Sequence, residues 1–129
     1  MKTGIIFGAF DLLHPGHLHV LKESSKRCDW LIVGLQVDPS DERKSKNKPV
    51  ETIFERYYRL DSCAFVDQII PYEGNRDLVN MLHVISPDVR FLGDDYEGHE
   101  EEIVGCGIVE IEYLPRKHDY SSTNLRKKL

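Results

Sequence analysis

Short apolar runs alternate with segments of helical periodicity along the chain, and this alternation limits the possible folds more than any other feature. Apolar runs predict five strands, at residues 3–7, 30–37, 65–70, 89–92 and 108–114. Helical spacing predicts helices at 16–28, 52–64 and 75–86. Strands that are apolar on both faces are typical of parallel sheets covered by helices. We therefore expect an α/β fold, a doubly wound five-stranded parallel sheet with right-handed crossovers.

Local signals set several of the expected boundaries. Thr52 with Glu55 forms a capping box that predicts the start of the second helix, and Asn75 is expected to cap the third. Pro71 is expected to end the third strand, and Pro115 the fifth. A short helix is expected near 99–104, and another begins at Ser121 or Ser122. At 129 residues the chain is long enough for one domain, which we place at 1–129.

Composition and charge exclude several classes of function. The net charge of −5 argues against a nucleic-acid binder, which is normally basic. No apolar run approaches the roughly 20 residues that cross a bilayer, and the N-terminus lacks the pattern of a signal peptide. Cys28, Cys63 and Cys106 form no metal or disulfide pattern, so we interpret them as small buried apolar residues. We expect a cytoplasmic protein that binds neither nucleic acid nor membrane.

Ligands of such sheets bind at the carboxyl ends of the strands, and the sequence after the first strand has the features of a phosphate site. Gly8 is expected to let the chain turn sharply, and Gly16 precedes a helix whose N–H groups favour an anion. His14 and His17, three residues apart at that helix start, could both donate to one anion. Two surface histidines near a helix cap are the alternative interpretation.

The stretch from Gly8 to His17 resembles the HxGH signature of the nucleotidyltransferase superfamily. Within it, the spelling of residues 10–14, Phe-Asp-Leu-Leu-His, is similar to that of the cytidylyltransferases. The resemblance extends end to end, and the length is similar to that of glycerol-3-phosphate cytidylyltransferases. It implies a Rossmann-like sheet, CTP as donor, Mg²⁺, release of pyrophosphate and commonly a homodimer. It also implies that the nucleotide-binding residues include Gly8, Ala9, Phe10, Asp11, His14, Gly16 and His17.

A basic loop at 43–48 follows the second strand, and its charge could clamp substrate phosphates on an acidic protein. A solvated surface loop is the alternative. In the resembled family, lysines of this loop contact phosphates, so Lys46 is expected at the nucleotide and in catalysis, and Lys44 at the acceptor. The loop differs by one residue from the glycerol-3-phosphate enzymes, which leaves Lys48 open.

Three further stretches are similar to elements of the same family. Residues 93–98, Gly-Asp-Asp-Tyr-Glu-Gly, imply that Asp94 serves the nucleotide, although paired acids also cap helices. After the fifth strand the expected phosphate-holding residues are Arg116, also assigned to catalysis, with Ser121, Ser122 and Thr123. Arg56 is expected to be structural or at a dimer contact. A family arginine is replaced by Ala64, and Arg59 is a candidate to compensate for it.

The resemblance predicts transfer of CMP from CTP to a small phosphorylated acceptor, with glycerol 3-phosphate the first candidate. The family lysine that contacts this acceptor is absent from residues 75–78, where Arg76 could replace it. Phosphoethanolamine, phosphocholine or a phosphorylated amino acid are the other acceptors considered. An adenylyltransferase and a non-catalytic nucleotide-binding module are the alternative functions, and the sequence identifies no metal ligands.

Overall fold

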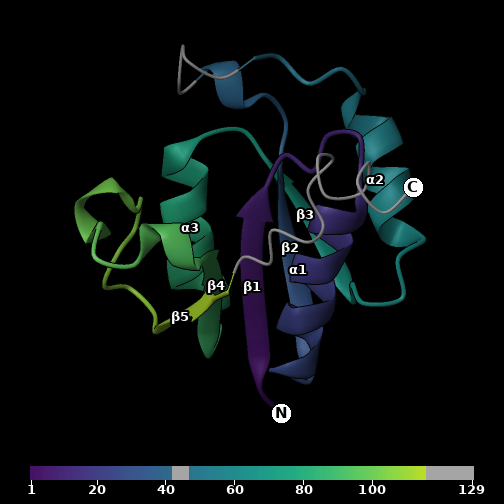
Figure 1. The fold of residues 1–129 in the computed structure, drawn as a ribbon. Helices are drawn as coiled ribbons and strands as arrows, with labels where there is room; N and C mark the ends of the chain where they lie inside the picture. Colours follow the sequence, from purple (N-terminus) through teal and green to yellow (C-terminus); the bar gives the residue numbers. More distant parts are fainter. Residues whose placement is uncertain (42–46, 116–129) are drawn as a thin grey trace.

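The structure is a computed structural model, and it describes residues 1–41 and 47–115 of the chain. Strands and helices alternate in it from one end to the other (Figure 1). The strands are β1 (Thr3–Gly8), β2 (Trp30–Gln36), β3 (Gln68–Tyr72), β4 (Val89–Gly93) and β5 (Ile111–Leu114). The α-helices are α1 (Pro15–Lys26), α2 (Ile53–Asp61) and α3 (Asn75–Ile85). Three 3₁₀ turns complete the description: η1 (Pro39–Asp41), η2 (Asp94–Tyr96) and η3 (Glu100–Glu102).

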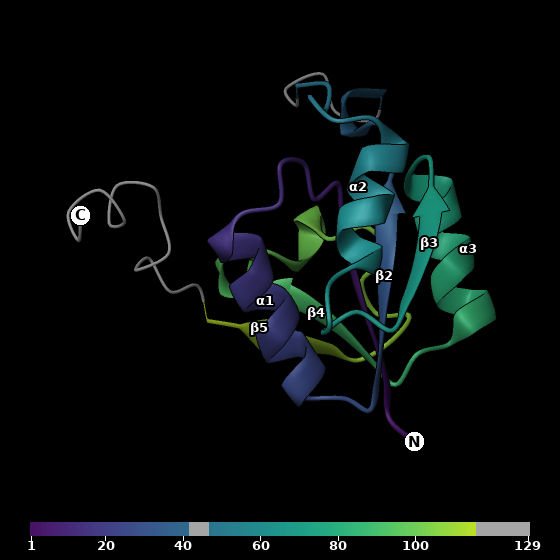
Figure 2. The same ribbon diagram turned by 90° about the vertical axis from the view of Figure 1, so that its right-hand side faces the viewer.

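All five strands lie parallel in one sheet of order β3-β2-β1-β4-β5. The chain therefore builds the sheet outward from β1 to one edge and then returns to add β4 and β5 on the other side. Figure 2 shows α1 and α2 on one face of the sheet and α3 on the opposite face. This confirms the expected Rossmann-like, doubly wound sheet. The reversal of strand order lies beside β1, which is the position where such sheets bind ligands.

Each face of the sheet has its own apolar core. One cluster joins the sheet to α1 and α2, and Leu21, Leu35, Leu60 and Phe91 are buried in it. The other joins the sheet to α3 through residues such as Ile5, Ile32 and Leu82. Because β1 and β2 contribute side chains to both clusters, their sequences are apolar without alternation. The apolar runs in the sequence thus reflect two covered faces.

Two boundary predictions were wrong for reasons of tertiary context. Pro71 lies inside β3, paired with Leu35, because β3 is an edge strand and an edge tolerates a residue without an N–H group. Asn75 is the first residue of α3 and does not cap it. Gly74 occupies the cap position without a side-chain hydrogen bond, and the Asp77 carboxylate accepts from the N–H of Glu73 nearby.

Other predictions were met in part. The capping box of Thr52 and Glu55 is present at the start of α2. The fifth strand is shorter than expected, and η3 is a single turn within the predicted 99–104 helix.

The interpretation of the cysteines as buried apolar residues was wrong for Cys106. Cys28 and Cys63 pack beside the first core cluster, but Cys106 is exposed, in a turn where Gly105 and Gly107 have positive φ angles. None of the helices described in the structure is long and apolar enough to span a membrane.

Candidate active site

The turn after β1 has an unusual backbone. Phe10 and Leu12 have φ angles of 47° and 48°, in the left-handed region that side chains with a Cβ avoid. Each such residue costs about 1–2 kcal/mol, so the rest of the structure must offset it. For Phe10 the offset is burial, because its ring lies in the core and meets the ring of His17 edge-on, with centroids 5.6 Å apart.

Gly8 has a different role from the one predicted. Its φ angle is not positive, so it does not make the turn itself. A Cβ at Gly8 would come within 3.0 Å of the Phe10 ring. Gly8 therefore provides the space in which that ring lies, and the left-handed residues Phe10 and Leu12 reverse the chain.

His14 and His17 lie together at the start of α1, as the motif predicted. Their rings stack with centroids 3.8 Å apart. His14 Nδ1 accepts a hydrogen bond from the Gly16 N–H at 3.1 Å, and His17 Nδ1 accepts from the His14 N–H at 3.3 Å. An acceptor nitrogen holds no proton, so in each neutral ring the proton is on Nε2. Both rings thus turn Nδ1 to the backbone and keep an Nε2–H group as donor.

The environment of His17 keeps it neutral. Burial, aided by the neighbouring His14, lowers the pKa of His17 to about 4, while Asp11 acts in the opposite direction. At neutral pH this side chain is a hydrogen-bond donor without a charge. The pair can therefore direct N–H groups at an anionic oxygen, which is the role that the sequence assigned to it.

Gly16 contributes to the N-terminal cap of α1. A Cβ there would lie 2.8 Å from His14 Cε1 and 3.0 Å from its Nδ1. Its N–H, expected to favour a phosphate, is donated to His14, and Pro15 has no N–H to offer. At this helix start the donors available to an anion are therefore those of the imidazole rings.

Arg56 joins three segments around the site through hydrogen bonds to their backbone. Its guanidinium is buried and donates to four backbone carbonyls, those of Ala9, Gln36, Val37 and Glu51. These carbonyls belong to the turn after β1, the end of β2 and the lead into α2. This confirms the structural alternative predicted for Arg56. A residue so enclosed within its own chain offers no surface for a dimer contact.

Asp11 and Glu51 connect the turn to the lead into α2. The Asp11 carboxylate accepts from the N–H groups of Val50 and Glu51, at 2.8 and 2.9 Å. In return Glu51 accepts from the N–H of Leu12 at 2.7 Å. Burial alone would raise the pKa of Asp11, but these backbone donors and Arg56 hold it below its usual value. Asp11 thus shapes the turn through its backbone partners.

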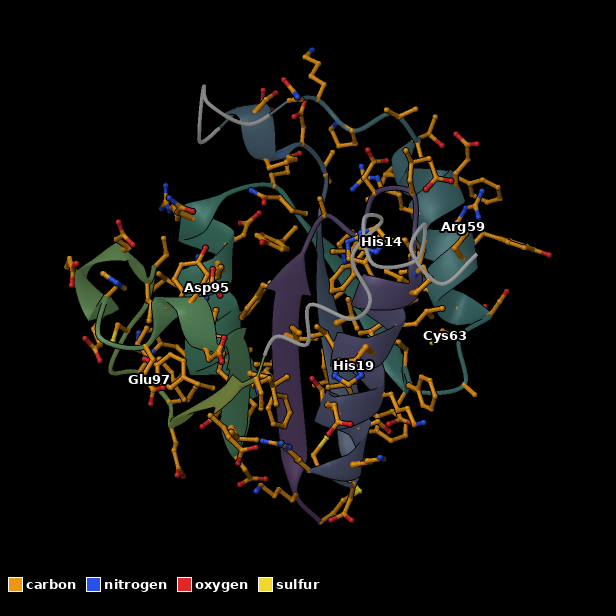
Figure 3. The ribbon with its side chains drawn as sticks, in the orientation of Figure 1. His14, His19, Arg59, Cys63, Asp95 and Glu97 are labelled. Carbon is orange, nitrogen blue, oxygen red and sulfur yellow. The ribbon has the colours of Figure 1, made fainter. Side chains whose placement is uncertain are left out.

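The remaining described candidates also lie at the carboxyl ends of strands. Asp94 and Asp95 begin η2 directly after β4, where Gly93 takes the cap position, so they do not act as its caps. Arg76 is exposed in the first turn of α3, after β3. In Figure 3, His14 and Arg59 lie on one side of β1, whereas Asp95 and Glu97 lie on the other.

Arg59, the candidate to replace the family arginine that is missing at Ala64, forms an ion pair with Glu51. Its Nε contacts the Glu51 carboxylate, while the side chain stays largely exposed. Glu51 itself was missed by the sequence analysis. It stands before the Thr52 cap like an ordinary acidic surface residue, and only the contact with Leu12, 39 residues earlier, reveals its position in the site.

Several predicted residues lie outside the part of the chain that the structure describes. They are Lys44, Lys46, Arg116, Ser121, Ser122 and Thr123. Lys48 is described and exposed. Within residues 1–41 and 47–115 there is no group of three or more His, Cys, Asp or Glu side chains that could hold a metal ion.

The chain belongs to the cytidylyltransferase-like family, whose model matches residues 5–128. It is 40% identical over 110 residues to the bifunctional protein HldE of Acidiphilium cryptum, and 36% identical over 131 residues to that of a Caulobacter species. These matches cover 84% and 97% of this chain but only 22% and 26% of the relatives. The chain therefore spans about a quarter of the length of these curated relatives.

A solved structure is similar over nearly its whole length. It is the lipopolysaccharide core biosynthesis protein from Thermoplasma volcanium, with a TM-score of 0.70 and 26% identity over 91% of this chain and 97% of that one. A pantothenate synthetase from Thermus thermophilus, at a TM-score of 0.62 and 16% identity, shares the fold. The family and the fold together define this chain as a nucleotidyltransferase-type protein.

Proposed function

We propose that this protein transfers a nucleoside monophosphate from a nucleoside triphosphate to a small phosphorylated acceptor. The observation that supports this most strongly is the stacked pair His14 and His17, each with Nδ1 bound to backbone and Nε2–H left as donor. An acceptor phosphate oxygen would attack the α-phosphorus, the bond to the bridging oxygen would break, and pyrophosphate would leave with that electron pair. The nucleophile is already anionic, so no covalent enzyme intermediate is needed.

The chain's own part in this reaction is to position charge and to stabilise it. Two preorganised N–H donors at the α-phosphate act where negative charge accumulates in the transition state. Lys46 and Arg116 are proposed to contact the donor's phosphates, with Ser121, Ser122 and Thr123 beside them, and Lys44 and Arg76 to contact the acceptor. Mg²⁺ is proposed to enter as the complex of the nucleotide, because this ion is bound largely through substrate phosphates.

CTP is the first candidate for the donor. It is supported by the family description and by the stretch Gly93 to Gly98 at the end of β4. Glycerol 3-phosphate remains a prediction from the resemblance, since none of the relatives described above is named for it. The family lysine that contacts glycerol 3-phosphate is also absent from residues 75–78, which argues against this acceptor.

ATP with a phosphorylated sugar is the second candidate. It is favoured by the similarity to the HldE proteins and to a lipopolysaccharide core biosynthesis protein, because a lipopolysaccharide core is made of sugars. This pair of substrates would give an ADP-linked sugar and pyrophosphate. A homodimer is proposed on the resemblance alone.

One experiment separates these candidates. CTP and ATP, each with Mg²⁺, are crossed with glycerol 3-phosphate, phosphoethanolamine, phosphocholine and sugar 1-phosphates that include heptose 1-phosphates, and pyrophosphate release is measured. We expect one donor to exceed the other by at least about tenfold in kcat/KM, which is a difference of about 1.4 kcal/mol. Pyrophosphate release from no pair of substrates, with nucleotide binding retained, would instead support a non-catalytic binding module.

A further inference from the structure

Glu51 is a buried carboxylate whose bonds lead to the histidine-bearing turn. One of its oxygens accepts from the N–H of Leu12, and the other pairs with the guanidinium of Arg59. Only 6% of Glu51 is exposed, while its partner Arg59 lies at the surface. A carboxylate placed inside a protein is costly unless its oxygens are bonded, so this arrangement fixes Glu51 in one position.

The bonded N–H group belongs to a strained residue. Leu12 has a φ angle of 48° and lies two residues before His14, and its side chain is exposed, so packing does not hold it in place. On the other side of the turn, Asp11 is bonded to the N–H groups of Val50 and Glu51. The carboxylates of Asp11 and Glu51 thus bind each other's backbone segment reciprocally, and both bonds act on the turn that leads into the His14 cap.

We propose that Glu51 is a positioning residue that fixes the Leu12 N–H group and thereby sets the direction of the His14 and His17 donors. Arg59 anchors it from the solvent side. Misplacement of catalytic donors by about 1 Å can cost about two orders of magnitude in rate, so a carboxylate outside the substrate's reach can still control turnover. This inference deepens the proposed function and rests on it where turnover is concerned.

Substitutions at Glu51 separate positioning from packing. Glu51→Gln keeps an oxygen that accepts from Leu12 but loses the ion pair with Arg59, whereas Glu51→Met loses both. Positioning through Leu12 predicts a kcat at least about tenfold lower for Glu51→Met, within about threefold of wild type for Glu51→Gln, and a nearly unchanged KM for the nucleotide. Glu55→Gln, an exposed glutamate on the same helix start, is the matched control and should keep its turnover.

A second readout needs no substrate. The pKa of His17, about 4 in the intact turn, is followed by NMR titration of the ring protons. When the turn loosens, His17 loses part of its burial beside His14, so its pKa should rise toward the ordinary value in Glu51→Met and stay near 4 in Glu55→Gln. The exchange rate of the Leu12 amide should increase in the same variant.

The outcomes decide both ideas separately. If wild type shows no transfer with any substrate pair, the proposed function fails, and the His17 titration still tests the role of Glu51. A folded Glu51→Met protein with wild-type His17 titration and protected Leu12 amide overturns the proposal. If Glu51→Met does not fold, Glu51→Asp decides, because its shorter side chain keeps the charge but no longer reaches the Leu12 N–H group. Leu12 exchange should then speed up and the His17 pKa should rise; wild-type values in Glu51→Asp overturn the proposal.

Discussion

Arg56 and Arg90 are both buried, but the chain surrounds them differently. Arg56, on α2, is 2% exposed and donates to four carbonyls of the segments that form the candidate site. Arg90, on β4, is 5% exposed and donates to the carbonyl of Val104. Its guanidinium lies 5.0 Å from the centre of the Phe7 ring, and its buried Nε has no hydrogen-bond partner among the residues that the structure describes.

The titratable groups near the two guanidiniums also differ: they are carboxylates near Arg56, and phenols and a thiol near Arg90. Burial lowers the pKa of both guanidiniums, and near Arg56 the carboxylates of Asp11, Glu51 and Asp38 oppose this. Near Arg90 the opposing groups are Tyr72, Cys106 and Tyr96. Phenols and thiols are largely neutral at pH 7, so Arg90 carries a buried charge with little compensation. The comparison teaches that burial alone does not make an arginine a structural support; its hydrogen-bond partners do.

Arg56→Met should have the largest effect on stability. The variant leaves four buried or half-buried carbonyls without their donor and removes the cation near three carboxylates. We expect a loss of about 3–5 kcal/mol in the free energy of unfolding. Urea unfolding checks this, with an unchanged m value as evidence of an intact cooperative transition. Arg76→Met, at an exposed position of α3, is the control, and equal losses in both variants would refute the supporting role of Arg56.

The turn that Arg56 supports leads to His14 and His17, the expected catalytic residues. His14→Ala and His17→Ala are each expected to lower kcat by two to three orders of magnitude, since one preorganised donor to a transition-state oxyanion contributes about 3–4 kcal/mol. Steady-state kinetics on the folded variants measures this. His83→Ala, an exposed histidine of α3, should keep its turnover. Near-normal turnover of either motif variant would remove that histidine from the mechanism.

Gly16→Ala should separate the geometry of this turn from its stability. The new Cβ would meet the His14 ring at 2.8 Å, so the ring must move away from its cap position. Alanine gains about 1 kcal/mol of helix propensity over glycine, which offsets part of the lost cap bond. We therefore expect at least about a tenfold lower kcat with a small change in unfolding free energy. Equal kcat in wild type and variant would mean that His14 does not need this cap.

The low pKa of His17 predicts how stability depends on pH. The folded value of about 4 lies below the ordinary 6.5, so between these values the unfolded chain binds a proton that the folded chain does not. The contribution of His17 is thus complete above about pH 6.5 and is lost as the pH falls toward about 4. Urea unfolding at about pH 7 and about pH 5 should show a larger drop for wild type than for His17→Gln. Equal drops would contradict the neutral, half-buried state of His17.

Local signals explain how far the sequence predicted the fold. Apolar runs and the Thr52 capping box depend on neighbouring residues, and they predicted the number and order of the strands and the start of α2. The strand bounds were less accurate: the third strand was expected at 65–70 and is Gln68–Tyr72, and the fifth was expected from residue 108 and begins at Ile111. Pro71 was misread because the edge position of β3 depends on the order of all five strands. Cys106 was misread because its exposure depends on the turn formed by the glycines on either side.

The site shows the same division. The motif was enough to bring His14 and His17 together, because both lie in one helix turn. Their proton positions follow from hydrogen bonds with backbone N–H groups two and three residues away. The hydrogen bond that holds the left-handed Leu12, and with it the role of Glu51, depends instead on contacts between segments about forty residues apart. Such contacts leave no periodic pattern in a sequence, so only the folded chain reveals them.

Arg90→Met should have the smallest effect and tests the other half of the comparison. The variant loses one hydrogen bond to Val104, of about 1 kcal/mol, and the contact of the guanidinium with Phe7, of about 0.5–2 kcal/mol. Against this it removes a buried charge and an unpartnered Nε, while methionine fills most of the space. We expect a change within about 1 kcal/mol in unfolding free energy, measured with urea beside Arg56→Met. Arg90→Ala, which leaves a cavity, should be clearly less stable than Arg90→Met. A loss at Arg90→Met as large as that at Arg56→Met would show that one carbonyl and one aromatic ring can support a buried arginine as well as four carbonyls do.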